Sequence, residues 1–96
     1  MPTLVSLVNL TDQGVRGIKE SPNRFKAFKT MAEEMGIKVK CFYYTQGQYD
    51  MVAILEGPDE ATMVALLNLS SLGNARFQTM RGYSVDEMNG FISKMQ

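Results

Sequence analysis

Apolar residues follow two different periods along this 96-residue chain, and each period predicts its own kind of element. Short runs rich in Val, Leu, Ile and Tyr predict β-strands, whereas apolar residues spaced three and four apart predict helices. The expected strands are residues 3–10, 38–45, 49–56 and 75–84, and the expected helices are residues 22–35, 60–71 and 85–95. A short turn at 46–48 joins the second and third strands as a hairpin.

Residues typical of helix ends support these boundaries. Ser21 is the expected N-cap of the first helix, and Gly36 lies just past its end. Asp59 is expected to cap the second helix, and the spacing of Ser84 and Glu87 matches a capping box before the third. The order is then β-α-β-β-α-β followed by a helix. This α+β order is the ferredoxin-like pattern, with one four-stranded antiparallel sheet and two helices on one face.

The inner strands are apolar on both faces, although the helices would cover only one. Residues 51–55 are all apolar while their side chains alternate between the faces, and residues 4–10 are nearly so. In the second strand, Val39, Cys41 and Tyr43 are expected to share one face. Leaving an apolar face in water would forgo several kcal/mol, in a domain whose net stability is about 5–15 kcal/mol. We therefore expect a further layer over the second face.

A second copy of the chain is the simplest cover, and two sheets packed face to face would form a dimeric α+β barrel. The alternative is that the C-terminal helix folds across the open face and completes a monomer. A helix of about eleven residues spans only about 16 Å at 1.5 Å per residue, which is short for this purpose. Self-association, as a homodimer or a larger homo-oligomer, is the favoured prediction.

Charge and composition argue against several classes of function. Ten Lys and Arg balance ten Asp and Glu, and a formal net charge of zero does not favour nucleic-acid binding. The nearest approach to a basic patch consists of Lys26, Lys29, Lys38 and Lys40, and it is interpreted as solvated surface because acidic residues lie close by. No apolar stretch is long enough to cross a bilayer, so no membrane association is expected.

The absence of some residue types limits the chemistry further. Histidine is absent, which removes a Ser-His-Asp triad, a histidine base and a His-ligated metal site. Cys41 is the one cysteine, so we expect neither an intrachain disulfide nor a cysteine-only metal site, and we predict a cytoplasmic protein. No metal and no cofactor are predicted. Cys41 and the eight methionines are interpreted as apolar filler rather than redox or copper-binding groups.

Four residues in the middle of the chain carry a family signature. GQYD at 47–50 resembles the Gly-x-Tyr-Asp element for which the GYD family is named, and the similarity continues through LTDQGVRGIKESPNR, FYYTQGQYDMVAILEGPDE and LSSLGNARFQTMRGYSVDEM. It runs over nearly the whole chain, with Leu10 as a departure where a more polar or aromatic residue is expected. The resemblance implies one GYD-like ferredoxin-like domain over residues 1–96 that pairs as a dimeric α+β barrel. It implies no activity, because the family has no established common biochemical function.

Asp50 is the most distinctive candidate for a functional side chain, because it stands at the start of an apolar strand. It could anchor a ligand or act as a general base in a cavity between sheets. The structural alternative, which is favoured, is that it accepts backbone N–H groups of the preceding turn or pairs with Arg81 or Lys40.

Tyrosines near the hairpin are the other candidates. Tyr44 and Tyr49 are expected to lie close across the turn, where they could clamp a planar ligand, although cross-strand packing alone would also explain them. The predicted ligand-binding residues are Tyr49, Asp50, Tyr44, Arg81 and Tyr43.

Three functions follow as hypotheses. The main one is a small-ligand-binding or regulatory homodimer without catalytic activity. The second is a cofactor-independent monooxygenase-like or lyase-like enzyme for a small aromatic substrate, with Asp50 as the base and Arg81 or Tyr44 stabilising the anion. The third is a structural assembly subunit in which Asp50 only locks the hairpin. The sequence itself names neither a ligand nor a reaction.

Overall fold

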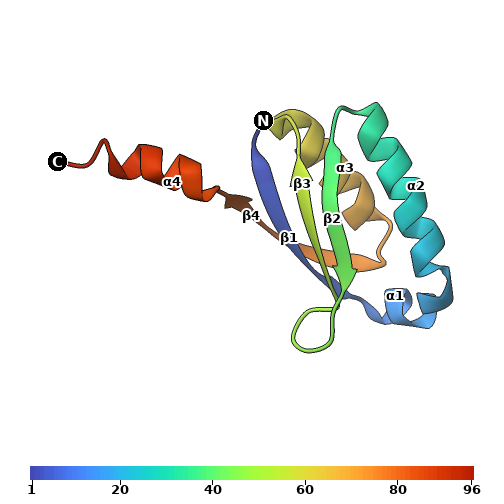
Figure 1. The fold of residues 1–96 in the computed structure, drawn as a ribbon. Coiled ribbons are helices and arrows are strands. Elements are labelled where there is room, and N and C mark those ends of the chain that lie inside the picture. The colour runs from blue at the N-terminus through green and yellow to red at the C-terminus, as the bar shows by residue number, and fades with distance from the viewer.

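Four antiparallel strands form one sheet in the order β2-β3-β1-β4, shown in Figure 1 for this computed structural model of residues 1–96. The elements follow one another as β1 (Thr3–Leu10), α1 (Asp12–Arg16), a 3₁₀ turn (Ile18–Glu20), α2 (Ser21–Glu34), β2 (Lys38–Tyr44), β3 (Met51–Glu56), α3 (Asp59–Ser71), β4 (Ala75–Gly82) and α4 (Val85–Ile92). The predicted ferredoxin-like order is confirmed, since β1 lies between β3 and β4 and both pairings are antiparallel.

Helices α2 and α3 cover one face of the sheet, and the core lies between them and the strands (Figure 1). Successive residues of β3 alternate between buried and half-buried, so only one of its two apolar faces is covered. The packed core consists of Ala32, Ile37, Ala53, Leu55 and Ala65, with side chains of α2, β2 and α3 around it. Twelve of the 96 residues are buried, so the core is small and much apolar surface stays accessible in the single subunit.

Aromatic rings hold α2 against β2. Phe25 stacks on Phe42 with ring centroids 4.1 Å apart, and Phe42 meets Tyr44 edge-on at 5.1 Å. The Ser21 hydroxyl lies 2.9 Å from the Tyr44 hydroxyl and shares a hydrogen bond with it. The predicted N-cap role of Ser21 is therefore wrong. The 3₁₀ turn runs directly into α2, so Glu20 already has helical backbone angles and Ser21 is the first helical residue.

Helix α3 also begins one residue earlier than predicted. Pro58, with an extended backbone, occupies the N-cap position, and Asp59 belongs to the first turn. The predicted cap role of Asp59 is wrong, although its carboxylate still lies at the positive end of the helix dipole. Gly36 and Gly73 follow α2 and α3 with φ of 81°, as expected for residues that end a helix.

A β-bulge in β2 changes which side chains face the helices. The register with β3 shifts between Val39 and Cys41, which makes Lys40 the extra residue. Val39 therefore packs against the core on the helix side, while Cys41 lies opposite Ile54 and faces the other way. The predicted grouping of Val39 with Cys41 and Tyr43 is wrong, because strict alternation holds only in an unbroken ladder.

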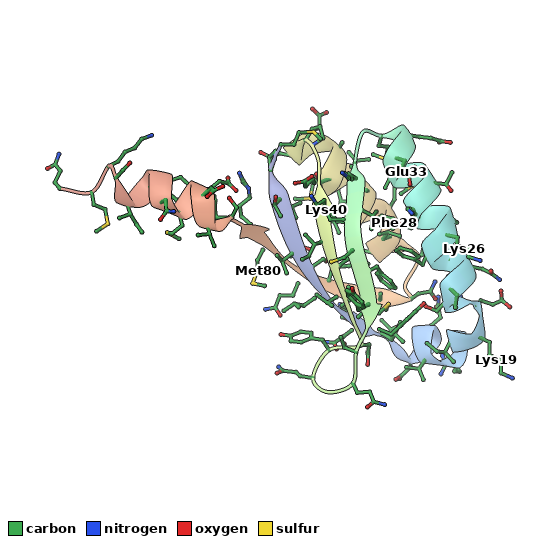
Figure 2. All side chains as sticks on the ribbon, viewed as in Figure 1. Lys19, Lys26, Phe28, Glu33, Lys40 and Met80 are labelled. Carbon is green, nitrogen blue, oxygen red and sulfur yellow. The ribbon has the colours of Figure 1, made fainter.

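The second face of the sheet carries no helix, and we call it the open face. All four strands contribute apolar side chains to it, and none of these is buried: Val5, Leu7, Cys41, Tyr43, Val52, Ile54 and Met80. Helix α4 does not fold across this face. It extends away from the sheet, on the side opposite α2, and Met80 points to that same side (Figures 1 and 2).

The extended α4 gives the subunit an elongated shape. Its radius of gyration is 14.8 Å and its longest extent is 52 Å, whereas a compact chain of this length would have a radius of gyration of about 12.5 Å. The alternative in which the C-terminal helix completes a monomer is therefore wrong. The predicted capping box is confirmed, with the Glu87 N–H donating to the Ser84 hydroxyl and the Ser84 N–H donating to the Glu87 carboxylate, both at 3.0 Å. The Ser84 backbone N–H is the main cause of a lowered pKa of Glu87, to which Arg81 adds.

The short helix α1 is clamped to the loop between α3 and β4. The Thr11 N–H donates to the Asn74 carbonyl at 3.1 Å, and the Thr11 hydroxyl donates to the Gly73 carbonyl at 2.6 Å. Gly14 is buried against this loop, and a Cβ atom on it would lie only 2.0 Å from the Asn74 carbonyl oxygen. The approach of the two backbones therefore requires glycine at position 14.

We expect Gly14→Ala to lower the free energy of unfolding by about 2 kcal/mol or more, because α1 must move off the loop to admit the methyl group. Urea denaturation measures the change. Gly90→Ala is the matched control, since a Cβ atom there meets nothing within 4 Å, and alanine is the better helix former by about 1 kcal/mol. Equal destabilisation by the two variants would contradict the clamp.

Candidate functional site

The Asp50 carboxylate is bound to the backbone of the neighbouring strand. Its Oδ2 atom accepts the Leu10 N–H at 2.8 Å, and its own N–H donates to the Val8 carbonyl at 2.8 Å. The Asp50 carbonyl accepts the Thr45 N–H at 2.9 Å, which closes the hairpin. Asp50 thus ties the end of β1 to the start of β3. The N–H that it accepts comes from the adjacent strand rather than from the preceding turn.

Two tyrosines of the hairpin lie on opposite faces of the sheet. Tyr44 lies opposite the buried Met51 on the helix side, where its hydroxyl reaches Ser21. The Tyr49 hydroxyl donates to the Gln78 side-chain oxygen at 2.6 Å, and Gln78 lies on the open face of β4. The predicted clamp between Tyr44 and Tyr49 is therefore wrong, because the sheet separates their rings.

Arg81 lies far from Asp50. It pairs with Leu4 at the start of β1, whereas Asp50 binds Leu10, and six residues of strand span about 20 Å. The Arg81 guanidinium lies over the Tyr83 ring, 5.0 Å from its centroid. The alternative partner Lys40 pairs with Glu56 instead, at 3.7 Å. Neither predicted ion pair with Asp50 forms.

The five predicted ligand-binding residues therefore do not converge on one pocket. Tyr43 lies on the open face at the edge strand, with 64% of its surface exposed, and Tyr49 and Asp50 lie at the opposite end of the sheet from Arg81. An enzymatic role for Asp50 as a base receives no support from this geometry, since one of its carboxylate oxygens holds the Leu10 N–H. Ligand contact by these residues stays a prediction.

An apolar groove of about 530 Å³ lies between α2 and α3, over the helix side of the sheet. Fifteen of its 21 lining residues are hydrophobic, and they come from α2, α3 and all four strands. None of the five predicted ligand-binding residues lines it. On its lining, the buried Ser6 hydroxyl shares a 3.0 Å hydrogen bond with Thr79, and Arg24 donates to the Gly17 carbonyl at 2.7 Å. The groove is therefore a largely apolar space in which the Ser6 and Arg24 side chains are already paired.

Small side chains aligned across three strands explain this hollow. Ser6 of β1 lies directly opposite Ala53 of β3 on one side and Thr79 of β4 on the other. Small residues at one level leave space that α2 and α3 do not fill. The sequence signal was Ser6 within an otherwise apolar stretch of strand, but its meaning depends on a strand register that the sequence alone does not give.

Three further observations concern metal binding, the free thiol and the membrane. No three His, Cys, Asp or Glu side chains come together where they could share a metal ion. Cys41 is a free thiol, half-buried on the open face. No helix of this structure has the length and apolarity needed to span a bilayer.

The chain is similar to known proteins over nearly its whole length. A family profile described as the GYD domain matches residues 4–92. The chain belongs to the GYD domain family. A relative from Thermus thermophilus, named glutamine synthetase and cystathionine beta-lyase binding protein, is 33% identical over 90 residues, which is 92% of this chain and 95% of that protein. No solved structure matches the chain.

In this GYD domain, the signature residues act together as a lock on the hairpin. Gly47 has φ of 128°, a conformation that residues with side chains rarely adopt. Tyr49 reaches Gln78 of β4, and Asp50 reaches Leu10 of β1. The signature therefore fixes the β2–β3 hairpin to both remaining strands.

We expect Asp50→Ala to lower the free energy of unfolding by about 1–3 kcal/mol, because the Leu10 N–H loses its acceptor. Asp50→Asn is the matched variant. It keeps a side-chain oxygen at the same place and should lose less. Urea denaturation measures the stabilities, and hydrogen exchange at the Leu10 amide reports the local effect. A wild-type urea midpoint for Asp50→Ala would show that the lock contributes nothing.

Proposed function

We propose that this GYD domain works as a non-catalytic homodimer that binds, and thereby regulates, an enzyme. The observation that carries the proposal is the relative from Thermus thermophilus, whose name states that it binds glutamine synthetase and cystathionine beta-lyase and which aligns with 92% of this chain. We infer that the partner of this chain is an enzyme of one of these two kinds.

The open face supports the homodimer. Its apolar side chains lie on inner and edge strands alike, so a second sheet packed against it would bury a continuous apolar layer. The formal net charge of the chain is zero, so two copies approach one another without overall repulsion. This arrangement would be the dimeric α+β barrel that the sequence favours.

The outward side of α3 supports the partner surface. Thr62 and Ala65 of this helix are buried, whereas Met63, Val64 and Leu67 are 57%, 43% and 61% exposed. A helix that is apolar all round is typical of a helix covered on both sides. Because α3 lies on the helix side of the sheet, a dimer formed through the open face would leave this surface accessible to another protein.

The partner is tested with purified glutamine synthetase and cystathionine beta-lyase from the organism that carries this chain. We expect calorimetry or biolayer interferometry to detect binding to at least one of them, and Leu67→Glu to weaken it by about 10-fold or more. Thr30→Glu on the exposed side of α2 adds the same charge and should bind like the wild type. Absence of binding to both enzymes by the wild-type chain would refute the proposal.

A regulatory small ligand is a second candidate, favoured by the groove between α2 and α3. Its volume of about 530 Å³ lies within the range of about 300–1,000 Å³ typical of small-molecule sites. Its lining fits a largely apolar small molecule, because most of the lining residues have aliphatic or aromatic side chains. Such a ligand would lie under α2 and α3, and would act on the partner through the position of α3.

The groove is tested with the uncharged apolar probe N-phenyl-1-naphthylamine. Ala53→Leu fills the hollow and should weaken probe binding by about 10-fold or more, because the added carbons occupy its space. Ile54→Leu is the matched control on the adjacent residue, whose side chain lies on the open face. Fluorescence titration measures both. If Ile54→Leu has the larger effect, the probe binds the open face and the groove candidate is wrong.

A further inference from the structure

Helix α4 is stabilised at its N-terminal end, but its apolar side is not covered by its own subunit. The capping box defines its start, the Tyr83 ring meets Phe91 edge-on at 5.2 Å, and the Arg81 guanidinium lies 5.0 Å from the centroid of the Tyr83 ring. Three residues of α4, together with Met95 just past its end, are apolar and spaced three and four apart, and we call them the α4 stripe. They are between 47% and 78% exposed: Val85, Met88, Ile92 and Met95. The polar residues of α4 lie mainly on its other sides.

A helix of this length needs a surface to pack on. The eight residues of α4 fall below the roughly 12–15 residues at which isolated helices become even marginally stable in water. Short helices in proteins owe their stability to packing of an apolar side. Its own subunit offers no such surface, because β4 carries α4 away from the sheet (Figure 1).

We propose that α4 is an exchanged arm, and that each copy in the homodimer packs its α4 stripe against the other copy. The inference rests on the homodimer of the proposed function. It adds a contribution from the partner copy, without which the apolar side of α4 stays uncovered. The position of α4 fits this role, because it extends on the side of the sheet that lacks helices, where a second copy would lie (Figure 1).

Charge complementarity favours a second copy of this chain as the occupant. The first turn of α4 carries Asp86 and Glu87 and its last turn carries no basic residue, so residues 85–96, with Lys94 after the helix, have a net charge of −1. On the strand positions of the open face Lys40 is paired with Glu56, which leaves two cations, Lys38 and Arg76, without an acidic partner. The acidic start of α4 and these two cations would attract one another between copies.

The open face is small for a dimer interface. An eight-residue strand is about 26 Å long and four strands are about 19 Å wide, a projected area of roughly 500 Å². Specific interfaces bury about 800 Å² of accessible surface on each partner, a quantity that exceeds the projected area because side chains make a face uneven, so the sheets alone would form an interface at the small end. Two exchanged arms would enlarge the contact beyond the sheets themselves.

The test compares two double variants of the full-length chain by analytical ultracentrifugation over a concentration series. Met88→Glu with Ile92→Glu places two charges in the α4 stripe, and it should raise the dimer dissociation constant by about 100-fold or more. Asn89→Glu with Ser93→Glu adds the same charges one position along, outside the stripe, and should stay close to the wild type. Circular dichroism confirms that both variants remain folded.

Each outcome decides between the proposals. A wild-type chain that is monomeric at every concentration overturns both the homodimer and the arm. A wild-type dimer that the stripe variant does not weaken relative to its control overturns the arm alone. As a second measurement, p-benzoylphenylalanine at position 92 should crosslink a tagged copy to an untagged copy on irradiation. Crosslinks confined to single chains would overturn the exchange.

Discussion

A sheet that is apolar on both sides, with helices on only one, is the constraint on which the rest of this structure depends. The helix side of β3 is buried while its other side is only half-covered, although both sides are equally apolar. Apolar surface stabilises a fold only when it leaves water. The subunit therefore holds a small core, an uncovered open face and a helix that projects past the sheet. The proposed homodimer would cover the open face and give the projecting helix a surface to pack on.

Much of the fold could be predicted from the sequence because periodicity and end signals agree at most elements. The strand from Thr3 to Leu10 and the capping box at Ser84 are found where the pattern placed them. Errors arose where tertiary context overrides a local signal. Ser21 is a good N-cap residue by type, but the turn before it is already helical and its hydroxyl bonds to Tyr44. In β2 a single extra residue, Lys40, moved Val39 to the other face.

The candidate site was less predictable, for a physical reason. Residues close in sequence, such as Tyr44 and Tyr49, are separated by the sheet once register and the hairpin loop are fixed. Residues that shape the groove, such as Ser6 and Ala53, are distant in sequence and ordinary in type. A sequence pattern shows which residue types are unusual. A groove, in contrast, depends on which small side chains the strand register brings next to one another. Asp50 of the family signature illustrates this difference. Its position in the sequence suggested a ligand-binding or catalytic carboxylate, whereas in the structure the carboxylate accepts a hydrogen bond from the backbone of β1.

The β2 edge of the sheet is poorly suited to receive another strand. The bulge at Lys40 interrupts its regular ladder, and exposed lysines at 38 and 40 keep charge along it. Both features are known to hinder edge-to-edge strand pairing. Strand addition at this edge is therefore disfavoured, which protects it from edge-to-edge aggregation even though the open face is uncovered.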